Sequence, residues 1–391
     1  MKAVGIIAEY NPLHNGHKYH IAEALRFAGS DAVVVAMSGD YVQRGEPAIL
    51  DKWERTRIAL ENGADLVVEI PTLFCLADAS GYAGAGVKIL DSLGCVSHLA
   101  YGSESGEVEP VKKMATNLKN SAADIDIRIS ELVKTGKSYP AARSLAYEEM
   151  FGEKLPDSSN DILGLEYVKA CSALEPIAVK RVGAGYNDDV PSGEYMSASG
   201  IRNAVIQGVS VDKYVPQDTA DALMNNKLTF ADDWMKTLKY AAMSMTAEEI
   251  DSCPSGGEGL GNRIKSLVNE AESWNQFAEL VKSKRYTHTR ISRLFTQMIL
   301  GINRCDFGLN EPAYIRILGM NETGRALLSQ INNQELSTLP IITNINKQRE
   351  LLDDQGLKQL ELDIHGADIY NLVTGRNQAD CSDYRMKPII L

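Results

Sequence analysis

Two histidines near the N-terminus have the spacing and setting of a phosphate site. His14 and His17 belong to the run HNGH, which follows a short apolar stretch and precedes apolar residues at helical spacing. They fall on one face of a first helical turn, where free N–H groups and a partial positive charge favour phosphate. Two imidazoles there can donate hydrogen bonds to a phosphoryl group as charge builds on it. The same residues would also suit a turn that merely caps a helix.

A second anion site is indicated far downstream, in the run SASGIR. Ser197 and Ser199 precede a helical pattern, and Arg202 falls within its first turn. Hydroxyl groups that cap a helix, together with an arginine, can hold an anion. The motif is weak alone, but paired with HNGH in one strand–helix pattern it predicts a single site with two helix N-termini.

Five apolar runs bounded by turn residues predict the strands that position these motifs. They alternate with helical patterns, which indicates an α/β fold with a parallel sheet and ligands at the carboxyl ends of its strands. The alternation ends near Pro216, and the rest is interpreted as helices, so we expect a catalytic domain over 1–215 and a helical domain over 216–391. The expected strands are Ala3–Ala8, Asp31–Met37, Ala64–Ile70, His98–Tyr101 and Ile177–Val182, and the expected helices after Pro216 are Asp218–Asn226, Phe230–Met245, Leu260–Ala271, Trp274–Lys284, Arg290–Ile302 and Gly324–Ile331.

Several turn residues at the same sheet edge have two interpretations each. Gly102 would let an adenine or ribose lie against the backbone, or it is an ordinary turn glycine. Asn160 is either a ligand contact or a helix cap. Asp40 would hold Mg²⁺ or cap its turn. Arg44 lies in a polar loop beside the expected phosphate site. Lys180 and Arg181 in the fifth strand point to opposite faces, so at most one of them faces a given site.

A basic segment in the second half of the chain has the composition of an RNA-binding surface. Between residues 281 and 330 there are eight basic and three acidic residues, with aromatic residues interleaved. Phosphate contacts and aromatic stacking are the usual means of binding RNA. The alternative is a helix whose basic face is simply solvated. The RNA-contacting residues that we predict are Arg44, Lys282, Arg285, Arg290, Arg293 and Arg316.

Composition excludes several classes of protein. The chain has 391 residues, a formal net charge of −12 and 44 % hydrophobic residues, so it can bury a large core but is not coated in nucleic acid. It has no apolar run of transmembrane length and no basic-then-apolar leader. The six cysteines form no CxxC pair or cluster, which favours reduced thiols in a cytoplasmic protein over a disulfide framework or zinc finger.

The motifs together resemble one bacterial family over essentially the entire chain. HNGH with SASGIR is similar to the signature pair of the HIGH nucleotidyltransferase superfamily, whose second motif closes over the triphosphate. Longer runs resemble the tRNA(Met) cytidine acetate ligases: EYNPLHNGH, MSGDYVQRGEPA, GADLVVEIP, YGSE, SSNDILGLEY, KRVGAGY, SASGIR, RYTHTRISR and YIRILGMNETGR.

The resemblance implies a reaction, a fold and a set of site residues. It implies a Rossmann-like parallel sheet of the HIGH nucleotidyltransferase type, followed by an α-helical C-terminal domain. Family members use ATP and acetate to make N4-acetylcytidine at the wobble position of elongator tRNA(Met), with no membrane or DNA partner, and Mg²⁺ is expected to assist. His14, His17, Ser197, Ser199 and Arg202 would be catalytic. The ATP contacts that carry over are Ile7, Ala8, Glu9, Tyr10, Asn11, His14, Asn15, Gly16, His17, Lys18, His20, Gly102, Asn160 and Arg181.

Two other classes of function share parts of this pattern. A small-molecule adenylyltransferase, acting on a mononucleotide or phosphopantetheine, would share the N-terminal half but leave the basic helical half without a task. A non-catalytic RNA-binding protein would keep ATP as a structural ligand only. Acetate specificity rests on the resemblance, since no acetate pocket is evident from residue spacing.

Overall fold

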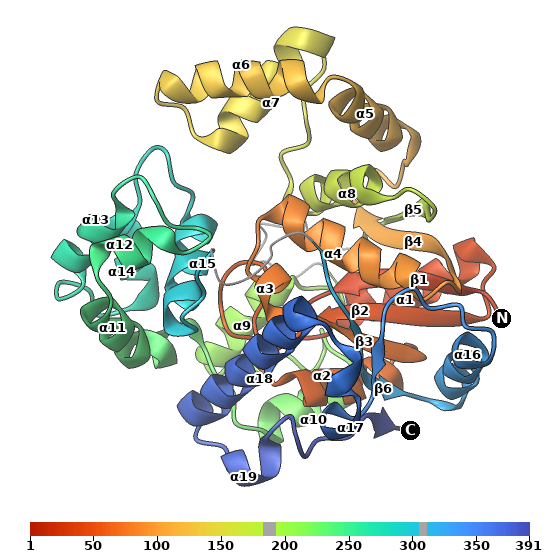
Figure 1. Ribbon diagram of the computed structural model, residues 1–391. Helices are drawn as coiled ribbons and strands as arrows, with labels where there is room; N and C mark the ends of the chain where they lie inside the picture. Colours follow the sequence, from red (N-terminus) through yellow and green to blue (C-terminus); the bar gives the residue numbers. More distant parts are fainter. Residues whose placement is uncertain (183–192, 305–310) are drawn as a thin grey trace.

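The computed structural model describes residues 1–182, 193–304 and 311–391, and a largely parallel sheet forms its centre (Figure 1). The strand order is β5-β4-β1-β2-β3-β6-β7, with β8 beside β6. The first five strands are parallel, as the sequence predicts, and β6 runs antiparallel to β3. The strands are β1 (Ala3–Ala8), β2 (Ala32–Ser38), β3 (Leu66–Ile70), β4 (Val96–Ser103), β5 (Glu175–Lys180), β6 (Ile315–Met320), β7 (Ile341–Ile342) and β8 (Ile389–Ile390).

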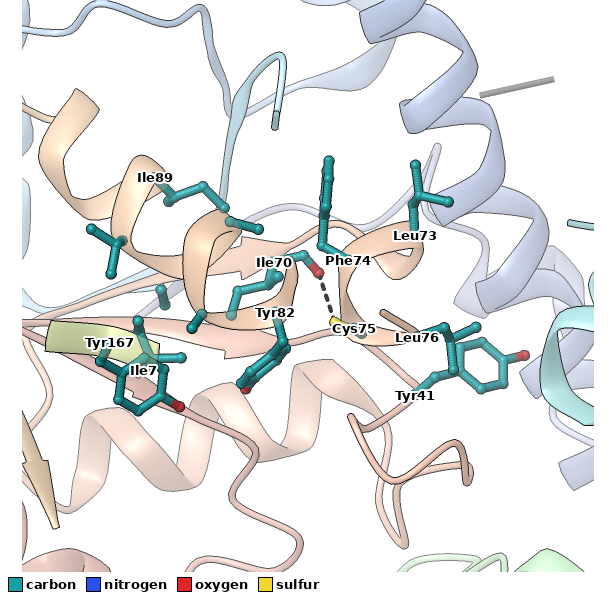
Figure 2. Close-up of a cluster of buried hydrophobic side chains, with 14 of the residues drawn as sticks. Ile7, Tyr41, Ile70, Leu73, Phe74, Cys75, Leu76, Tyr82, Ile89 and Tyr167 are labelled. Atoms are coloured by element: carbon teal, nitrogen blue, oxygen red, sulfur yellow. Dashed lines mark hydrogen bonds between the residues drawn. The ribbon is translucent and has the colours of Figure 1, made fainter. Parts of the chain in front are cut away.

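The central strands are apolar throughout because both sheet faces are covered. Successive β2 side chains point to opposite faces, so Val34 and Ala36 join one core cluster while Val33 and Val35 join the other. Figure 2 shows part of the first cluster, where the Cys75 thiol donates to the Ile70 carbonyl at 3.2 Å. Burial on both faces is the reason that these strands appear as continuous apolar runs rather than alternating ones.

Helices cover both faces, and among the described ones none has the length and apolar character needed to cross a bilayer. In Figure 1, α5–α7 stand away from the sheet beyond α8, and α11–α15 form a separate group to one side. The helices are α1 (Asn15–Ala28), α2 (Lys52–Glu61), α3 (Thr72–Cys75), α4 (Ala79–Ser92), α5 (Glu109–Asn120), α6 (Ala122–Lys134), α7 (Tyr139–Phe151), α8 (Ser159–Ala170), α9 (Ala198–Ile206), α10 (Gln217–Asn225), α11 (Met235–Ser244), α12 (Ala247–Ser252), α13 (Leu260–Leu267), α14 (Trp274–Val281), α15 (His288–Ile299), α16 (Glu322–Asn333), α17 (Ile345–Gln348), α18 (Asp354–Thr374) and α19 (Gln378–Cys381).

The second half of the chain is not wholly helical, which corrects the sequence interpretation. Residues Ile315–Met320 form β6, and all six side chains are buried. The strand extends the sheet of the first half by pairing with β3. The error arose because a short apolar run among helices has no periodicity of its own that separates a strand from a helix.

A buried group of charges joins β6 to the first half and to the C-terminal tail. Arg316 contacts Asp383 at 2.6 Å and Glu69 at 3.1 Å, and Lys52 contacts the same two carboxylates at 2.7 and 2.8 Å. All four side chains are almost fully buried. Asp40 is a further buried carboxylate, 3.9 Å from Lys52, so the two cations offset most of the negative charge, as buried charges require.

Candidate active site

Two helix N-termini meet at the carboxyl edge of the sheet. Helix α1 follows β1 with His14 as its N-cap, and α9 begins after Ser197, whose Oγ accepts from the Gly200 N–H at 3.0 Å. Arg202 in the first turn of α9 donates from Nη1 to the Asn11 carbonyl at 2.7 Å, which connects the two motifs. The predicted convergence of HNGH and SASGIR is therefore present.

The capping hydrogen bonds of α1 set which imidazole nitrogen carries the proton. Nδ1 of His14 accepts from the Gly16 N–H at 3.1 Å, and Nδ1 of His17 accepts from the His14 N–H at 3.3 Å. A neutral imidazole that accepts at Nδ1 carries its hydrogen at Nε2. The rings stack with centroids 3.7 Å apart, so both Nε2–H groups are left to donate to a ligand.

Gly16 is required by the His14 ring itself. A Cβ at this position would lie 2.9 Å from the His14 Cε1 atom. The glycine in the motif therefore leaves room for the His14 imidazole to fold back over the start of α1. In this position the ring caps the helix through Nδ1 and can also donate to a ligand through Nε2.

The histidines act as neutral donors rather than as cations. Burial and the nearby Arg181 guanidinium lower the pKa of His14 to about 3 and that of His20 to about 4, and the pKa of His17 is also well below its usual value. Positive charge in the site thus comes from Arg181, from Arg202 and from the helix N-termini.

The motifs line one cavity of about 1410 Å³. This volume exceeds the usual range for a single small-molecule site, about 300–1,000 Å³, so the cavity can hold a nucleotide with a second substrate. Apart from the two oxygens of the ion-paired Glu166, five buried polar atoms of its lining have no hydrogen-bond partner among the described residues: Tyr10 Oη, His20 Nε2, Tyr101 Oη, Asn160 Nδ2 and Arg293 Nε. Buried polar groups are rarely left unpaired, which favours a polar ligand such as ATP.

The ambiguous turn residues now have defined positions. Gly102 lines the cavity, where a Cβ would contact the Arg181 side chain at 3.5 Å. Asn160 is not the cap of α8, because Ser158 caps that helix by accepting from the Asp161 N–H. Its amide is left to face the cavity.

Asp40 accepts a backbone hydrogen bond from α2, whose N-cap is Asp51, and lies outside the cavity lining. Its Oδ1 accepts from the Lys52 N–H at 2.8 Å, at the start of α2. The carboxylate is buried, and burial raises its pKa to about 6. Among the described residues no three His, Cys, Asp or Glu side chains are grouped as metal ligands. Mg²⁺ commonly binds through substrate phosphates, so the ion would come with the nucleotide.

Known proteins match the chain over its full length. A family model described as HIGH Nucleotidyl Transferase matches residues 1–384. The tRNA(Met) cytidine acetate ligase of Clostridium novyi is 35 % identical over 412 residues, with 100 % of both chains covered. That of Caldanaerobacter subterraneus subsp. tengcongensis is 36 % identical, with 95 % of each covered. The chain belongs to the tRNA(Met) cytidine acetate ligase family.

Solved structures of this ligase family agree with the fold. Thermotoga maritima TmcAL in its apo form I has a TM-score of 0.92 at 33 % identity, with both chains fully covered. The same protein bound with alpha-thio ATP has a TM-score of 0.90 at 32 % identity and full coverage. The predicted fold class, a Rossmann-like sheet of the HIGH type, is confirmed.

Most predicted ATP contacts of the ligase line the cavity, and two do not. Lys18 is exposed on α1. The Asn15 side-chain amide instead donates to the carbonyls of Glu194 and Lys213, so it fixes the chain before and after α9. The predicted contacts in the lining are Ile7, Ala8, Glu9, Tyr10, Asn11, His14, Gly16, His17, His20, Gly102, Asn160 and Arg181, with Ser197, Ser199 and Arg202. Gly183–Gly185 of the KRVGAGY run, and Cys305, lie outside the described residues.

The predicted RNA-contacting residues separate into three groups. Arg44, Arg285, Arg290 and Arg293 line the same cavity as the nucleotide motifs. Lys282 is exposed at the end of α14. Arg316 is a wrong prediction, because it is 3 % exposed and paired with Glu69 and Asp383.

Sequence reasoning missed Arg55 and Gln43. Arg55 is buried and donates to the Leu50, Glu9, Ser38 and Gly39 carbonyls. It thereby holds the ends of β1 and β2 together. The Gln43 N–H donates to Glu9 Oε1 at 2.8 Å. An isolated arginine on a polar helix face carries no sequence signal for such a role.

Two histidines of the free ligase should stay neutral in mildly acidic solution. Because their pKa values lie near 3 and 4 rather than 6.5, we expect the His14 and His20 ring resonances not to titrate between pH 5 and 8 in an NMR titration. The unfolded chain would take up these protons first, so stability should fall as pH drops below about 6.5. A ring resonance of either histidine that titrates near pH 6.5 would contradict neutral donors.

Proposed function

We propose that the chain activates acetate with ATP and acetylates N4 of the wobble cytidine of elongator tRNA(Met). An acetate oxygen attacks the α-phosphorus, which forms acetyl-adenylate and expels pyrophosphate. The cytidine N4 then attacks the acetyl carbonyl and AMP leaves. This proposal is supported above all by one cavity that joins two facing helix N-termini to a lining of arginines. Such work belongs in the cytoplasm, where tRNA is modified.

Charge stabilisation would carry the first step. The Nε2–H groups of His14 and His17 donate to phosphoryl oxygens, and the cationic Arg181 and Arg202 balance the negative charge of the triphosphate. Ser197 caps α9, and the Ser199 Oγ lies 3.1 Å from its Oγ, so the two hydroxyls can orient the anion at this helix start. No covalent enzyme intermediate is required, because acetate is the nucleophile and the fixed geometry supplies much of the acceleration.

Acetate-dependent exchange of labelled pyrophosphate into ATP, without tRNA, tests the activation step. The proposal predicts exchange with acetate and none without it. Exchange that needs another acceptor instead of acetate would indicate a small-molecule adenylyltransferase. No exchange with either would favour an RNA-binding protein that uses ATP structurally.

We further propose that α11–α15 present the tRNA to the cavity. Arg285 is half exposed and lies 4.0 Å from Glu258, while Arg290 stacks on the Tyr286 ring at 4.8 Å and donates to the Ser255 and Gly256 carbonyls. The exposed guanidinium of Arg285 is suited to contact a phosphate of the tRNA. Arg290, which already holds a loop in place, is suited to recognise the shape of the RNA.

Arg285→Ala should weaken tRNA binding and flatten its salt dependence. Loss of one phosphate contact lowers the slope of log affinity against log salt by about 0.7–0.9. Affinity measured from about 50 to 200 mM salt checks this, with Lys358→Ala at an exposed position of α18 as the matched loss of charge outside α11–α15 and outside the cavity lining. An unchanged slope for Arg285→Ala would contradict the placement of tRNA.

A further inference from the structure

Glu9 differs in its surroundings from the other carboxylates that line the cavity. Glu166 forms ion pairs with two cations of α7 and α8, and Asp78 caps α4. Asp126 lies on α6, beyond the nucleotide motifs. Glu9 directly follows β1, five positions before His14, and forms no ion pair among the described residues. It is thus a cavity carboxylate that no cation of the described residues pairs with, in the same lining as His14 and His17.

Glu9 and Arg293 are fixed on the two backbone groups of one residue. Glu9 Oε1 accepts from the Gln43 N–H at 2.8 Å, and Arg293 Nη1 donates to the Gln43 carbonyl at 3.3 Å. Glu9 directly follows the strand β1, and Arg293 belongs to α15. The loop that contains Gln43 therefore fixes both an acceptor and a donor that line the cavity.

The loop itself is locked against α15. The Gly45 carbonyl accepts from the Ser292 hydroxyl at 3.1 Å and from the Thr296 hydroxyl at 2.7 Å. Gly45 has a φ of 84°, and a Cβ there would lie 2.2 Å from the backbone nitrogen of Arg293. On the other side, Arg55 Nη1 donates to the Glu9 carbonyl at 2.7 Å. Such anchoring fixes both side chains before a ligand arrives.

Arg293 has donor capacity left over. Its side chain is 8 % exposed, it lines the cavity, and its Nε is buried without a hydrogen-bond partner among the described residues. Burial lowers its pKa to about 10, which leaves the guanidinium charged at neutral pH. A buried cation with an unused N–H beside a cavity is suited to a ligand that accepts hydrogen bonds.

We propose that Glu9 and Arg293 bind the pairing edge of the target cytosine, and that Glu9 accepts the proton that N4 loses. This inference rests on the proposed function. Cytosine presents the N4 amine as a donor next to the acceptors N3 and O2, and a carboxylate accepting from N4 is an established pairing. An arginine donates to N3 and O2 from its fork.

The proton transfer completes the second step. The N4 electron pair forms the new bond to the acetyl carbon, and the bond from that carbon to the AMP oxygen breaks, with its electron pair leaving on AMP. N4 gives up one hydrogen to Glu9, which passes it to solvent. Uridine, with oxygen in place of N4 and an N–H at N3, offers neither the nucleophile nor the acceptor.

The first experiment separates the two half-reactions in Glu9→Gln, which keeps an oxygen to accept from Gln43. Acetate-dependent pyrophosphate exchange reports adenylation, and a single turnover of enzyme-bound labelled acetyl-adenylate with tRNA(Met) reports transfer. We expect transfer to fall about 100-fold more than exchange, the scale of a lost general base. Asp126→Asn, the matched loss of a cavity carboxylate, should change neither. An equal fall in both half-reactions would overturn the role of Glu9.

The second experiment measures base discrimination in Arg293→Lys, which keeps the charge but loses the fork. Wild-type protein should bind tRNA(Met) with cytidine at the wobble position about 5- to 100-fold tighter than with uridine there, and the variant should bring this ratio near one. Arg285→Ala should weaken both tRNAs alike. An unchanged ratio in Arg293→Lys would overturn the subsite, whereas absence of acetyl transfer in the wild type would refute the proposed function itself.

Discussion

His17→Ala is expected to lower acetyl-adenylate formation by about 100- to 1,000-fold, the usual effect of removing one donor from a developing oxyanion. The His17 Nδ1 is occupied by the His14 N–H, so Nε2–H is the ring donor that faces the phosphates. Acetate-dependent pyrophosphate exchange measures the loss. Binding of tRNA should change little, because the cavity arginines that would contact it lie on other elements.

The control for this substitution is His365→Ala, which removes an exposed histidine of α18. It should leave the exchange rate unchanged. Because His17 also caps α1, loss of the cap should cost about 1 kcal/mol of stability, and thermal unfolding would reveal it. An exchange rate within threefold of wild type in His17→Ala would rule out phosphate contact by this histidine.

Arg316→Met should destabilise the protein by about 3–5 kcal/mol, the usual result of breaking a buried ion pair from one side. Glu69 and Asp383 would then share Lys52 as their remaining nearby cation, with one carboxylate left uncompensated in the interior. Unfolding in urea would measure the change. Where the variant stays folded, its salt slope for tRNA should equal that of wild type, because Arg316 is buried.

Arg325→Met is the matched substitution at an exposed position of α16, and it should alter the unfolding free energy by no more than about 0.5 kcal/mol. The double variant Arg316→Met/Asp383→Asn removes the excess negative charge and should recover part of the loss. A cost below 1 kcal/mol for Arg316→Met would mean that the four charges do not act as one group.

The nucleotide half of the site could be predicted from sequence because its signals are local. The β1 strand, the turn with His14 and the start of α1 are contiguous, and the strand pattern and helix signals agree. Ser197 likewise predicts the start of α9, because serine is a preferred N-cap residue. Which of Ser158 and Asn160 caps α8 needed the structure, since both residue types favour that position.

The arginines could not be assigned from sequence because their partners are remote in the chain. Arg316 pairs with Glu69 and Asp383 across the sheet. Arg293 donates to the carbonyl of Gln43, which lies in a loop of the first half of the chain. A basic segment looks equally basic whether its members are solvated, paired or aimed into a cavity. The strand β6 was missed for a related reason, since its pairing with β3 depends on tertiary contacts.

Acetylation of the wobble cytidine is tested by mass spectrometry of nucleosides from unmodified tRNA(Met) incubated with the protein, ATP, Mg²⁺ and isotopically labelled acetate. We expect labelled N4-acetylcytidine at the wobble position, with one AMP released per acetyl group. ATP consumption without labelled nucleoside would contradict this expectation in favour of another acceptor, and no ATP turnover would contradict an acetate ligase altogether.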